Sequence, residues 1–228
     1  MKRILGFLSL ISGFILFFSC DNGEGDCQKN WYVSIRNPSA IVEIDTLNDE
    51  LSMQMENPSG VDAETYQRTV SGDFNFRIDF RNFARPNLTD EISYAALVLY
   101  DPTVPDTIVD TSIVMAGIMN GKLFAVATVT DTVYKNTNGN KGIFNVRRTG
   151  NLITVKSISG FDTAVIERVY KAQPSRIGFR IGTLDSSSSA SGMLGIKITN
   201  FEVITGANQG LNPIVSDDFK CNSLGKKD

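Results

Sequence analysis

The chain has 228 residues, with 22 Lys and Arg against 25 Asp and Glu, and it contains no histidine. At roughly 150 residues per domain, this length allows one large domain or two small ones. The missing histidine excludes Ser-His-Asp and Cys-His nucleophile systems, His-ligated zinc and haem held by a proximal His. A net charge of -3 without a basic run argues against nucleic-acid binding, which needs clustered Lys and Arg.

The N-terminus reads as a targeting segment. Lys2 and Arg3 precede an apolar stretch, residues 4–18, that is too short to span a bilayer comfortably, so residues 1–19 are predicted to be a signal peptide. The sequence Phe-Phe-Ser-Cys at 17–20 resembles the lipobox of Bacteroidetes-type cell-envelope lipoproteins. That resemblance implies lipidation of Cys20, palmitate included, and anchoring to the outer membrane. An ordinary secretory signal with a chance cysteine is the alternative.

A short polar segment follows the cysteine. Residues 20–26 hold the lipidated Cys20 and a Gly-rich, acidic stretch with no apolar side chain to bury, which is typical of a flexible tether. Acidic residues at this place also resemble the surface-export signal of the same lipoproteins, which implies display at the cell surface. A plain solvated linker explains them as well. Residues 27–228 then form one domain.

Two cysteines remain, one at each end of that domain. In an oxidising envelope compartment, Cys27 and Cys221 are expected to pair as a disulfide, because domain termini often lie close together. Two unpaired buried thiols are the alternative.

The period between the cysteines is two, which predicts strands. Residues 74–80, Phe-Asn-Phe-Arg-Ile-Asp-Phe, give the clearest alternation of apolar and polar side chains. In chain order, the predicted strands are 31–35, 41–44, 51–55, 74–80, 92–100, 113–119, 123–129, 143–147, 152–158, 164–170, 177–181 and 193–204.

Turn signals separate these strands. Asn120-Gly121 and Gly150-Asn151 each lie between two strands with almost nothing else, as in short hairpins. Only Ala63 to Arg68 is expected to form a helical turn or two, and the Ser-rich residues 185–192 are expected to be a loop. Many short strands without helical crossovers predict an all-β, antiparallel two-sheet sandwich.

Part of this strand succession resembles a known family. Gly72-Asp73-Phe74 at a strand start, the turn around Gly150-Asn151, and the strands at 176–182 and 196–203 look like those of concanavalin A-like, laminin G-like jelly-roll domains. The resemblance covers residues 70–204. It implies two curved antiparallel sheets, and it implies glycan binding or a spacer role.

An acidic motif near the N-terminus raises the question of hydrolysis. Glu43-Ile44-Asp45 resembles part of the Glu-x-Asp-x-x-Glu motif of laminarinase-type glycosidases, but Asn48 occupies the third acidic position. A retaining mechanism needs two carboxyl groups about 5 to 5.5 Å apart. We therefore read these residues as an exposed, acidic strand end.

Binding and metal candidates are few. Tyr66 and Tyr134 are expected to be surface rings that could contact a glycan, whereas Trp31 is expected to pack in the core. Asp101, Asp106 and Asp110 lie in a Pro-containing loop and could supply oxygen ligands to Ca²⁺. Turn capping by aspartate is the commoner explanation for such residues, and no other cofactor is expected.

Four threonines follow an aspartate and precede an apolar residue. Thr46, Thr107, Thr132 and Thr163 therefore resemble the O-glycosylation motif of exported Bacteroidetes proteins. Capping aspartates before strands produce the same triplets.

These observations predict a lipid-anchored protein of the cell envelope with one β-sandwich. The expected role is a non-catalytic module that binds a polysaccharide or another envelope protein. A glycoside hydrolase-like enzyme that uses carboxylates, or a purely structural envelope subunit, is the alternative.

Overall fold

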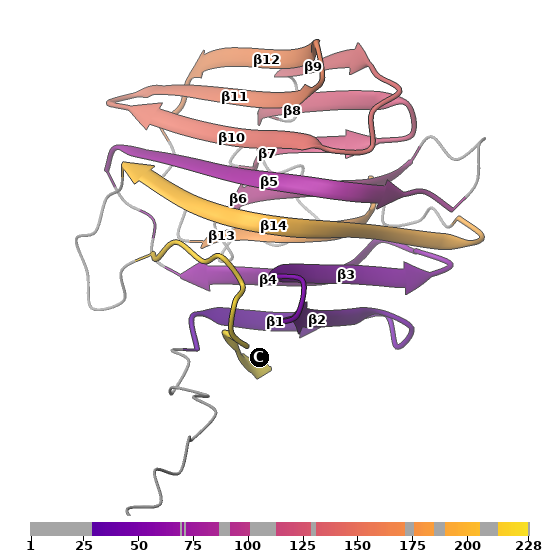
Figure 1. The fold of residues 1–228 in the computed structure, drawn as a ribbon. Coiled ribbons are helices and arrows are strands. Elements are labelled where there is room, and N and C mark those ends of the chain that lie inside the picture. Colours follow the sequence, from indigo (N-terminus) through magenta and orange to yellow (C-terminus); the bar gives the residue numbers. More distant parts are fainter. Residues whose placement is uncertain are drawn as a thin grey trace, which may run out of the picture.

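A computed structural model describes the folded part of the chain (Figure 1). The described residues are 29–68, 70, 72–86, 92–100, 113–128, 131–171, 176–184, 190–205 and 214–227. Residues 1–19, the tether at 20–26 with Cys20, and the first domain residue, Cys27, lie outside these ranges. The described ranges contain no helix long and apolar enough to cross a membrane.

Fifteen strands make up the regular structure of the described residues. They are β1 (Trp31–Ile35), β2 (Ile41–Asp45), β3 (Glu50–Glu56), β4 (Val61–Arg68), β5 (Phe74–Ala84), β6 (Ser93–Tyr100), β7 (Val114–Met119), β8 (Lys122–Thr128), β9 (Asp131–Asn136), β10 (Gly142–Thr149), β11 (Leu152–Ser159), β12 (Asp162–Val169), β13 (Arg176–Thr183), β14 (Met193–Thr205) and β15 (Leu224–Lys227).

The strands form two sheets that lie one behind the other (Figure 1). Sheet A has the order β15-β1-β4-β13-β6-β7-β8-β9, and sheet B has the order β12-β11-β10-β5-β14-β3-β2. Neighbouring strands are antiparallel except β1 and β15, which pair in parallel. The predicted all-β, two-sheet sandwich is therefore confirmed.

Alternating side chains build the core between the sheets. In β5 the apolar residues Phe74, Phe76, Ile78 and Phe80 are buried, while the polar residues between them are partly exposed. The ring of Phe80 stacks on Phe144 of β10, with 4.3 Å between centroids. The period of two that predicted these strands thus follows from burial of one face of each sheet.

The segment expected to form a helical turn is instead the strand β4. It lies between β1 and β13 in sheet A, and it pairs with both. Its outward side chains are polar or aromatic and still buried: Glu64 is 7% exposed and Tyr66 0%. The helical expectation was wrong because a strand buried on both faces need not alternate between apolar and polar residues.

Trp31 connects both sheets with the C-terminal segment. Its indole is 1% exposed and packs against Phe179 of β13, Phe201 of β14 and Phe219, with centroids 5.0, 5.1 and 6.3 Å away. Its Nε1–H donates a 2.8 Å hydrogen bond to Asp217 Oδ2. The expectation that Trp31 packs in the core is confirmed.

Asp217 holds several groups of the C-terminal segment at once. Besides Trp31, its carboxylate accepts hydrogen bonds from the Ser223 hydroxyl and from the Phe219 amide, the latter at 2.8 Å. Its backbone forms an antiparallel bridge with Phe201, with N–O distances of 2.9 and 2.8 Å. The segment that leads into β15 is thereby fixed against both sheets.

We predict that Asp217→Asn lowers the free energy of unfolding by about 1–3 kcal/mol, because one carboxylate oxygen that accepts hydrogen bonds becomes an amide donor. Urea unfolding measures this change. Asp218→Asn is the matched control, since the Asp218 carboxylate is exposed and pairs only with exposed Lys220. Equal unfolding midpoints for the two variants would contradict the central role of Asp217.

Candidate functional site

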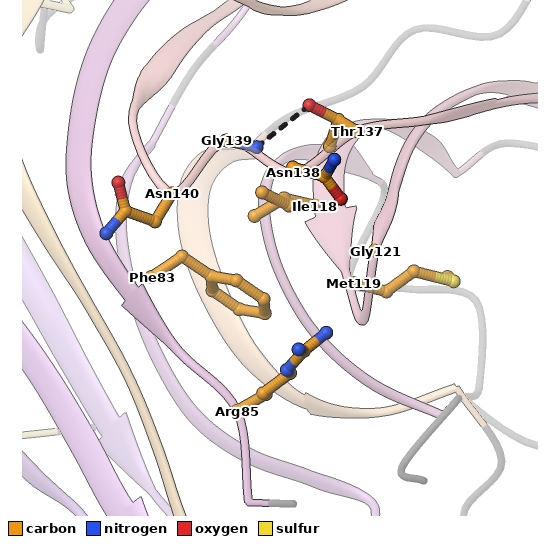
Figure 2. Close-up of a pocket in the computed structure, with 9 residues that line it drawn as sticks. All are labelled: Phe83, Arg85, Ile118, Met119, Gly121, Thr137, Asn138, Gly139 and Asn140. Atoms are coloured by element: carbon orange, nitrogen blue, oxygen red, sulfur yellow. Dashed lines mark hydrogen bonds between the residues drawn. The ribbon is translucent and has the colours of Figure 1, made fainter. Parts of the chain in front are cut away.

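A cavity of about 190 Å³ opens at one end of the sandwich (Figure 2). Three chain segments surround it: the end of β5, the turn from β7 to β8, and the connection from β9 to β10. The lining residues are Phe83, Arg85, Ile118, Met119, Gly121, Thr137, Asn138, Gly139 and Asn140.

Backbone hydrogen bonds join these three segments around the cavity. The amide of Phe83 donates to the carbonyl of Asn140 at 3.0 Å, and the amide of Thr137 donates to the carbonyl of Gly121 at 2.9 Å. Gly121 has a φ of 63°, which its turn requires and which a side chain would disfavour. The cavity walls are therefore set by backbone contacts between strand ends.

The lining combines an apolar surface with polar groups. Figure 2 shows Arg85 and Asn138 at opposite ends of the cavity, with the Phe83 ring and Met119 on either side. Arg85 Nη1 donates a hydrogen bond to Asn120 Oδ1. The lining thus has one cation and no acid, beside an aromatic ring and amides, which is the chemistry that binds a polar ligand with apolar faces.

The outward face of sheet A carries a second polar cluster, which we call the tyrosine–arginine ladder. Its members alternate across β1, β4, β13 and β6: Tyr32, Tyr66, Arg68, Arg176, Arg180 and Tyr100. The Tyr32 and Tyr66 rings stack 5.4 Å apart. Guanidinium groups lie over the Tyr32, Tyr66 and Tyr100 rings at 4.2, 4.2 and 4.6 Å. These distances are within the range of cation–π attraction.

Glu64 is the acid of the ladder. It lies opposite Arg180 in register and accepts a hydrogen bond from Arg180 Nη2 at 3.3 Å. Burial raises the pKa of Tyr100 to about 12, and the neighbouring Glu64 carboxylate adds to the effect. Tyr100 therefore keeps its proton at neutral pH and is a poor candidate for a general base.

An apolar cluster lies beside the ladder on this outward face. Tyr94, Met115, Met119 and Phe124 are all buried there, although they point away from the main core. The Phe124 ring lies over Gly117, where a Cβ would overlap it. A set of well-packed apolar side chains with no ionisable carboxyl or amine group offers no acid or base for catalysis.

Solved structures share this architecture, although no protein-family model and no curated protein matches the chain. The β-glucanase of Bacillus licheniformis superposes with a TM-score of 0.55 at 10% identity, over 78% of this chain and 92% of the glucanase. A glycoside hydrolase family 16 endo-glucanase from Bacteroides ovatus gives 0.50 at 9% identity, over 77% and 95%. An alginate lyase of polysaccharide lyase family 7 gives 0.50 at 12% identity, over 76% and 86%.

The fold is a concanavalin A-like jelly roll. At these identities the likeness concerns the arrangement of strands. The functional residues have to be taken from this chain itself.

Of the two tyrosines that were expected at the surface, one is buried and the other is exposed. Tyr66 is 0% exposed inside the ladder, so its expected place as a surface ring was wrong: β4 is an interior strand and neighbouring side chains cover its outward face. Tyr134 is 53% exposed on the edge strand β9, opposite Phe124. A ligand role for Tyr134 remains a prediction.

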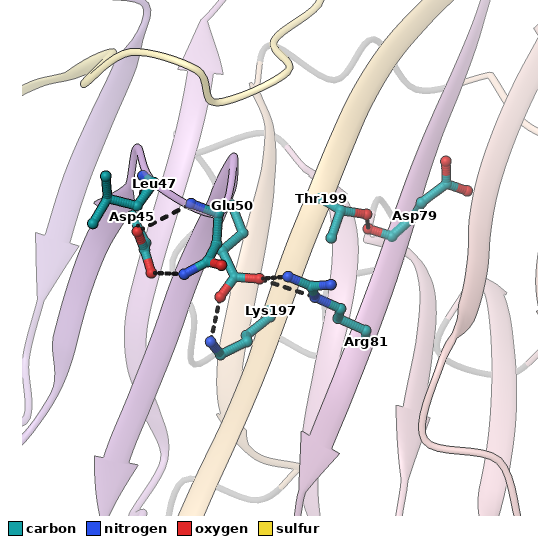
Figure 3. Close-up of polar contacts among 8 residues, drawn as sticks. Asp45, Leu47, Glu50, Asp79, Arg81, Lys197 and Thr199 are labelled. Carbon is teal, nitrogen blue, oxygen red and sulfur yellow. Dashed lines mark hydrogen bonds and ion pairs between the residues drawn. The ribbon is translucent and has the colours of Figure 1, made fainter.

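The Glu43-Ile44-Asp45 motif lies on β2, at the edge of sheet B in this jelly roll. Asp45 accepts hydrogen bonds from the Leu47 amide at 3.0 Å and from the Asn48 side chain at 2.6 Å (Figure 3). These bonds lower the pKa of Asp45, the Asn48 side chain most. The residue in the third acidic position of the motif therefore helps to fix a turn.

The remaining predicted site residues are only partly described. Outside the described residues lie Asp101, Asp106, Asp110 and Thr107. The described residues themselves contain no group of three His, Cys, Asp or Glu side chains that could hold a metal ion. Of the other threonines, Thr46 and Thr163 are exposed and Thr132 is half-buried. Their modification stays a prediction.

The sequence did not point to Phe83, Arg85 or Asn138 as site residues. The available signals were the predicted turn at Asn120-Gly121 and the turn-forming dipeptide Asn138-Gly139, which mark two walls of the cavity. Nothing in the residue order brings Arg85 beside them, since the antiparallel pairings of β5, β7 and β9 decide that proximity.

A buried carboxylate on the outward face of sheet B complements two cations (Figure 3). Glu50 is 0% exposed, and its oxygens accept hydrogen bonds from Lys197 Nζ and from Arg81, whose Nε lies 2.9 Å away. Burial by itself would raise the pKa of Glu50, but the hydrogen bonds and charges of Lys197 and Arg81 outweigh it, so the pKa is lowered. Glu50 thus ties β3 to β5 and β14.

We predict that Glu50 contributes stability above its unfolded-state pKa of about 4.3 and that this contribution is lost as the pH falls through the lower folded-state pKa. Glu50→Gln should lower the free energy of unfolding by about 1–3 kcal/mol at pH 7 and weaken its dependence on pH in the acid range. Urea unfolding at several pH values tests this.

Glu43→Gln is the control, because Glu43 is exposed on the adjacent strand. If the acid-range slopes of the wild-type and Glu50→Gln proteins coincide, the ion-paired role of Glu50 is refuted.

Proposed function

We propose that this chain is a lipid-anchored protein of the cell envelope whose jelly roll binds glycans without cleaving them. The observation that carries the proposal is the cavity, which places the Phe83 ring, the Arg85 guanidinium and the Asn138 amide around one small space. Sugars present apolar ring faces and polar hydroxyl groups, and an aromatic ring with amide and guanidinium donors complements both.

The structural neighbours support a glycan as the ligand class. Those that superpose with TM-scores of 0.50 or more include a β-glucanase, an endo-glucanase and an alginate lyase. These proteins act on polysaccharides, and their strand arrangement is that of this chain. We therefore propose the same class of ligand for this chain, but not the reactions that those enzymes catalyse.

A non-catalytic role fits the distribution of acids better than hydrolysis does. The residues that line the cavity include no carboxylate. A retaining or inverting glycosidase needs two carboxyl groups. Hydrolase activity, the alternative, would require two acids outside this lining.

The anchoring part of the proposal rests on the N-terminal sequence. Cys20 lies eleven positions before Trp31, and the intervening residues are polar and rich in Gly and Asp. A lipidated Cys20 would therefore hold the jelly roll at the outer membrane by a short tether, and surface display would bring it to extracellular polysaccharide. More than one acyl chain is needed for stable anchoring.

A disulfide between Cys27 and Cys221 would join the start of the domain to the C-terminal segment. Both the Asn30 and the Trp31 amides donate to the Ser223 carbonyl, at 3.0 and 3.2 Å, so the chain just after Cys27 runs beside the chain just after Cys221. A disulfide needs Cα atoms within about 7 Å of each other, and this nearby pairing of the two chain segments supports the proposal.

We expect the intact mass of the mature protein to show three changes relative to the full sequence: loss of residues 1–19, addition of acyl chains at Cys20, and the mass of one disulfide. Mass spectrometry of the unreduced protein, purified from membranes, measures all three. Cys20→Ala should abolish acylation and release the protein from the membrane fraction. A free-thiol count of two would refute the disulfide, and an unacylated Cys20 would refute the anchor.

We also expect the chain from residue 21 onward, which retains every described residue, to bind at least one polysaccharide class on a glycan array. Phe83→Ala should weaken that binding about tenfold, because loss of a ring contact costs on the order of 1 kcal/mol. Calorimetric titration with the strongest array ligand gives the affinities.

Phe161→Ala is the matched control, since Phe161 is a fully exposed ring on the β11–β12 turn, outside the cavity lining. Unchanged unfolding midpoints must accompany the comparison. No glycan binding at high concentration would defeat the proposed function. Binding that depends on Phe161 instead of Phe83 would move the site, and turnover of a bound glycan would favour the hydrolase.

A further inference from the structure

Arg85 differs from four other arginines of the jelly roll in having no carboxylate partner among the described residues. Arg77, Arg81, Arg168 and Arg180 all form ion pairs with carboxylates. Arg85 forms none with the described residues, and its hydrogen-bond partner there is the neutral side-chain oxygen of Asn120. The half-buried guanidinium thus brings an uncompensated positive charge to the cavity wall.

Arg85 is also held in place. The hydrogen bond from Nη1 to Asn120 Oδ1 uses one of the five N–H donors of a guanidinium, and an amide acceptor fixes the group without neutralising it. The other donors remain available for a planar, doubly hydrogen-bonded contact with a carboxylate. An oriented guanidinium loses less conformational entropy on binding than a mobile one.

The remaining walls require more than a bare anion. The Phe83 ring, Ile118 and Met119 offer apolar surface, and Asn138 offers an amide at the other end (Figure 2). The volume of about 190 Å³ equals that of roughly six waters at about 30 Å³ each. That space suits a single sugar residue and is below the range of about 300–1,000 Å³ that holds drug-sized ligands.

We infer that the cavity selects an acidic sugar residue, with its carboxylate on Arg85, its ring face on Phe83 and a hydroxyl group on Asn138. This inference rests on the proposed glycan-binding function and names its ligand class: a uronate-bearing glycan. A neutral sugar would leave the charge of Arg85 unmatched, and free phosphate would leave the apolar walls without a partner.

The test compares two ligands that differ only in charge. The chain from residue 21 onward is titrated calorimetrically with an oligo-uronate and with the same oligosaccharide after its carboxyl groups have been reduced to alcohols. We expect the acidic ligand to bind at least tenfold more tightly. Arg85→Gln, which retains a donor for Asn120, should remove this preference, because it should weaken binding of the acidic ligand at least tenfold more than binding of the reduced ligand.

Arg147→Gln is the matched charge control. Arg147 is an exposed cation on β10, outside the cavity lining, so its loss should preserve the preference for the acidic ligand. Equal effects of the two substitutions would show general electrostatic attraction and overturn the inference. Equal affinities for both ligands would overturn it while leaving glycan binding in place, whereas no binding of any glycan would defeat the proposed function as well.

Discussion

The hydrogen bond from the Trp31 indole to Asp217 fixes the C-terminal segment against the sandwich. Trp31 belongs to β1 of sheet A, yet its ring packs on Phe201 of sheet B and on Phe219 of the C-terminal segment. Through Asp217 it also fixes the path to β15, which then pairs with β1 itself. The first and last strands, β1 and β15, are thereby joined at one edge of sheet A.

The cavity lies at strand ends that take no part in fixing β1 and β15. The cavity is built from the end of β5 and from two connections that belong to β7, β8, β9 and β10, away from the Trp31 cluster. Strand β5 and the residue that follows it contribute both to the stability of sheet B and to the cavity. Arg81 is neutralised by Glu50 and stabilises the sheet, while Arg85, four residues later, keeps its charge beside the cavity.

Most of this fold could be predicted from the sequence, because a strand with one buried face and one solvent-exposed face alternates between apolar and polar residues. β5 and the hairpins at Gly121 and Gly150 follow directly from alternation and turn residues, and both glycines have a positive φ. The sequence did not predict β4 as a strand, because its outward residues Glu64 and Tyr66 are buried against side chains from other strands. It did not predict β9 for the opposite reason: an edge strand with few buried side chains shows little alternation.

The candidate site was less accessible to such reasoning. Alternation identifies which face of a strand is buried, but it does not say which strand ends meet. Arg85 and Asn138 are 53 positions apart, and the pairing of β5 with β10 and of β8 with β9 brings them together. The absence of a carboxylate partner for Arg85 among the described residues is likewise a property of the packed structure.

The open sandwich has one further consequence, which concerns its four edge strands. An edge exposes unpaired amide and carbonyl groups that can act as templates for a second copy of the chain. Here the edges β2, β9, β12 and β15 all bear charged residues, and Arg168 of β12 forms a 3.5 Å ion pair with Asp131 of β9 across the two sheets. Charged edges of this kind disfavour sheet-to-sheet association between copies of the chain.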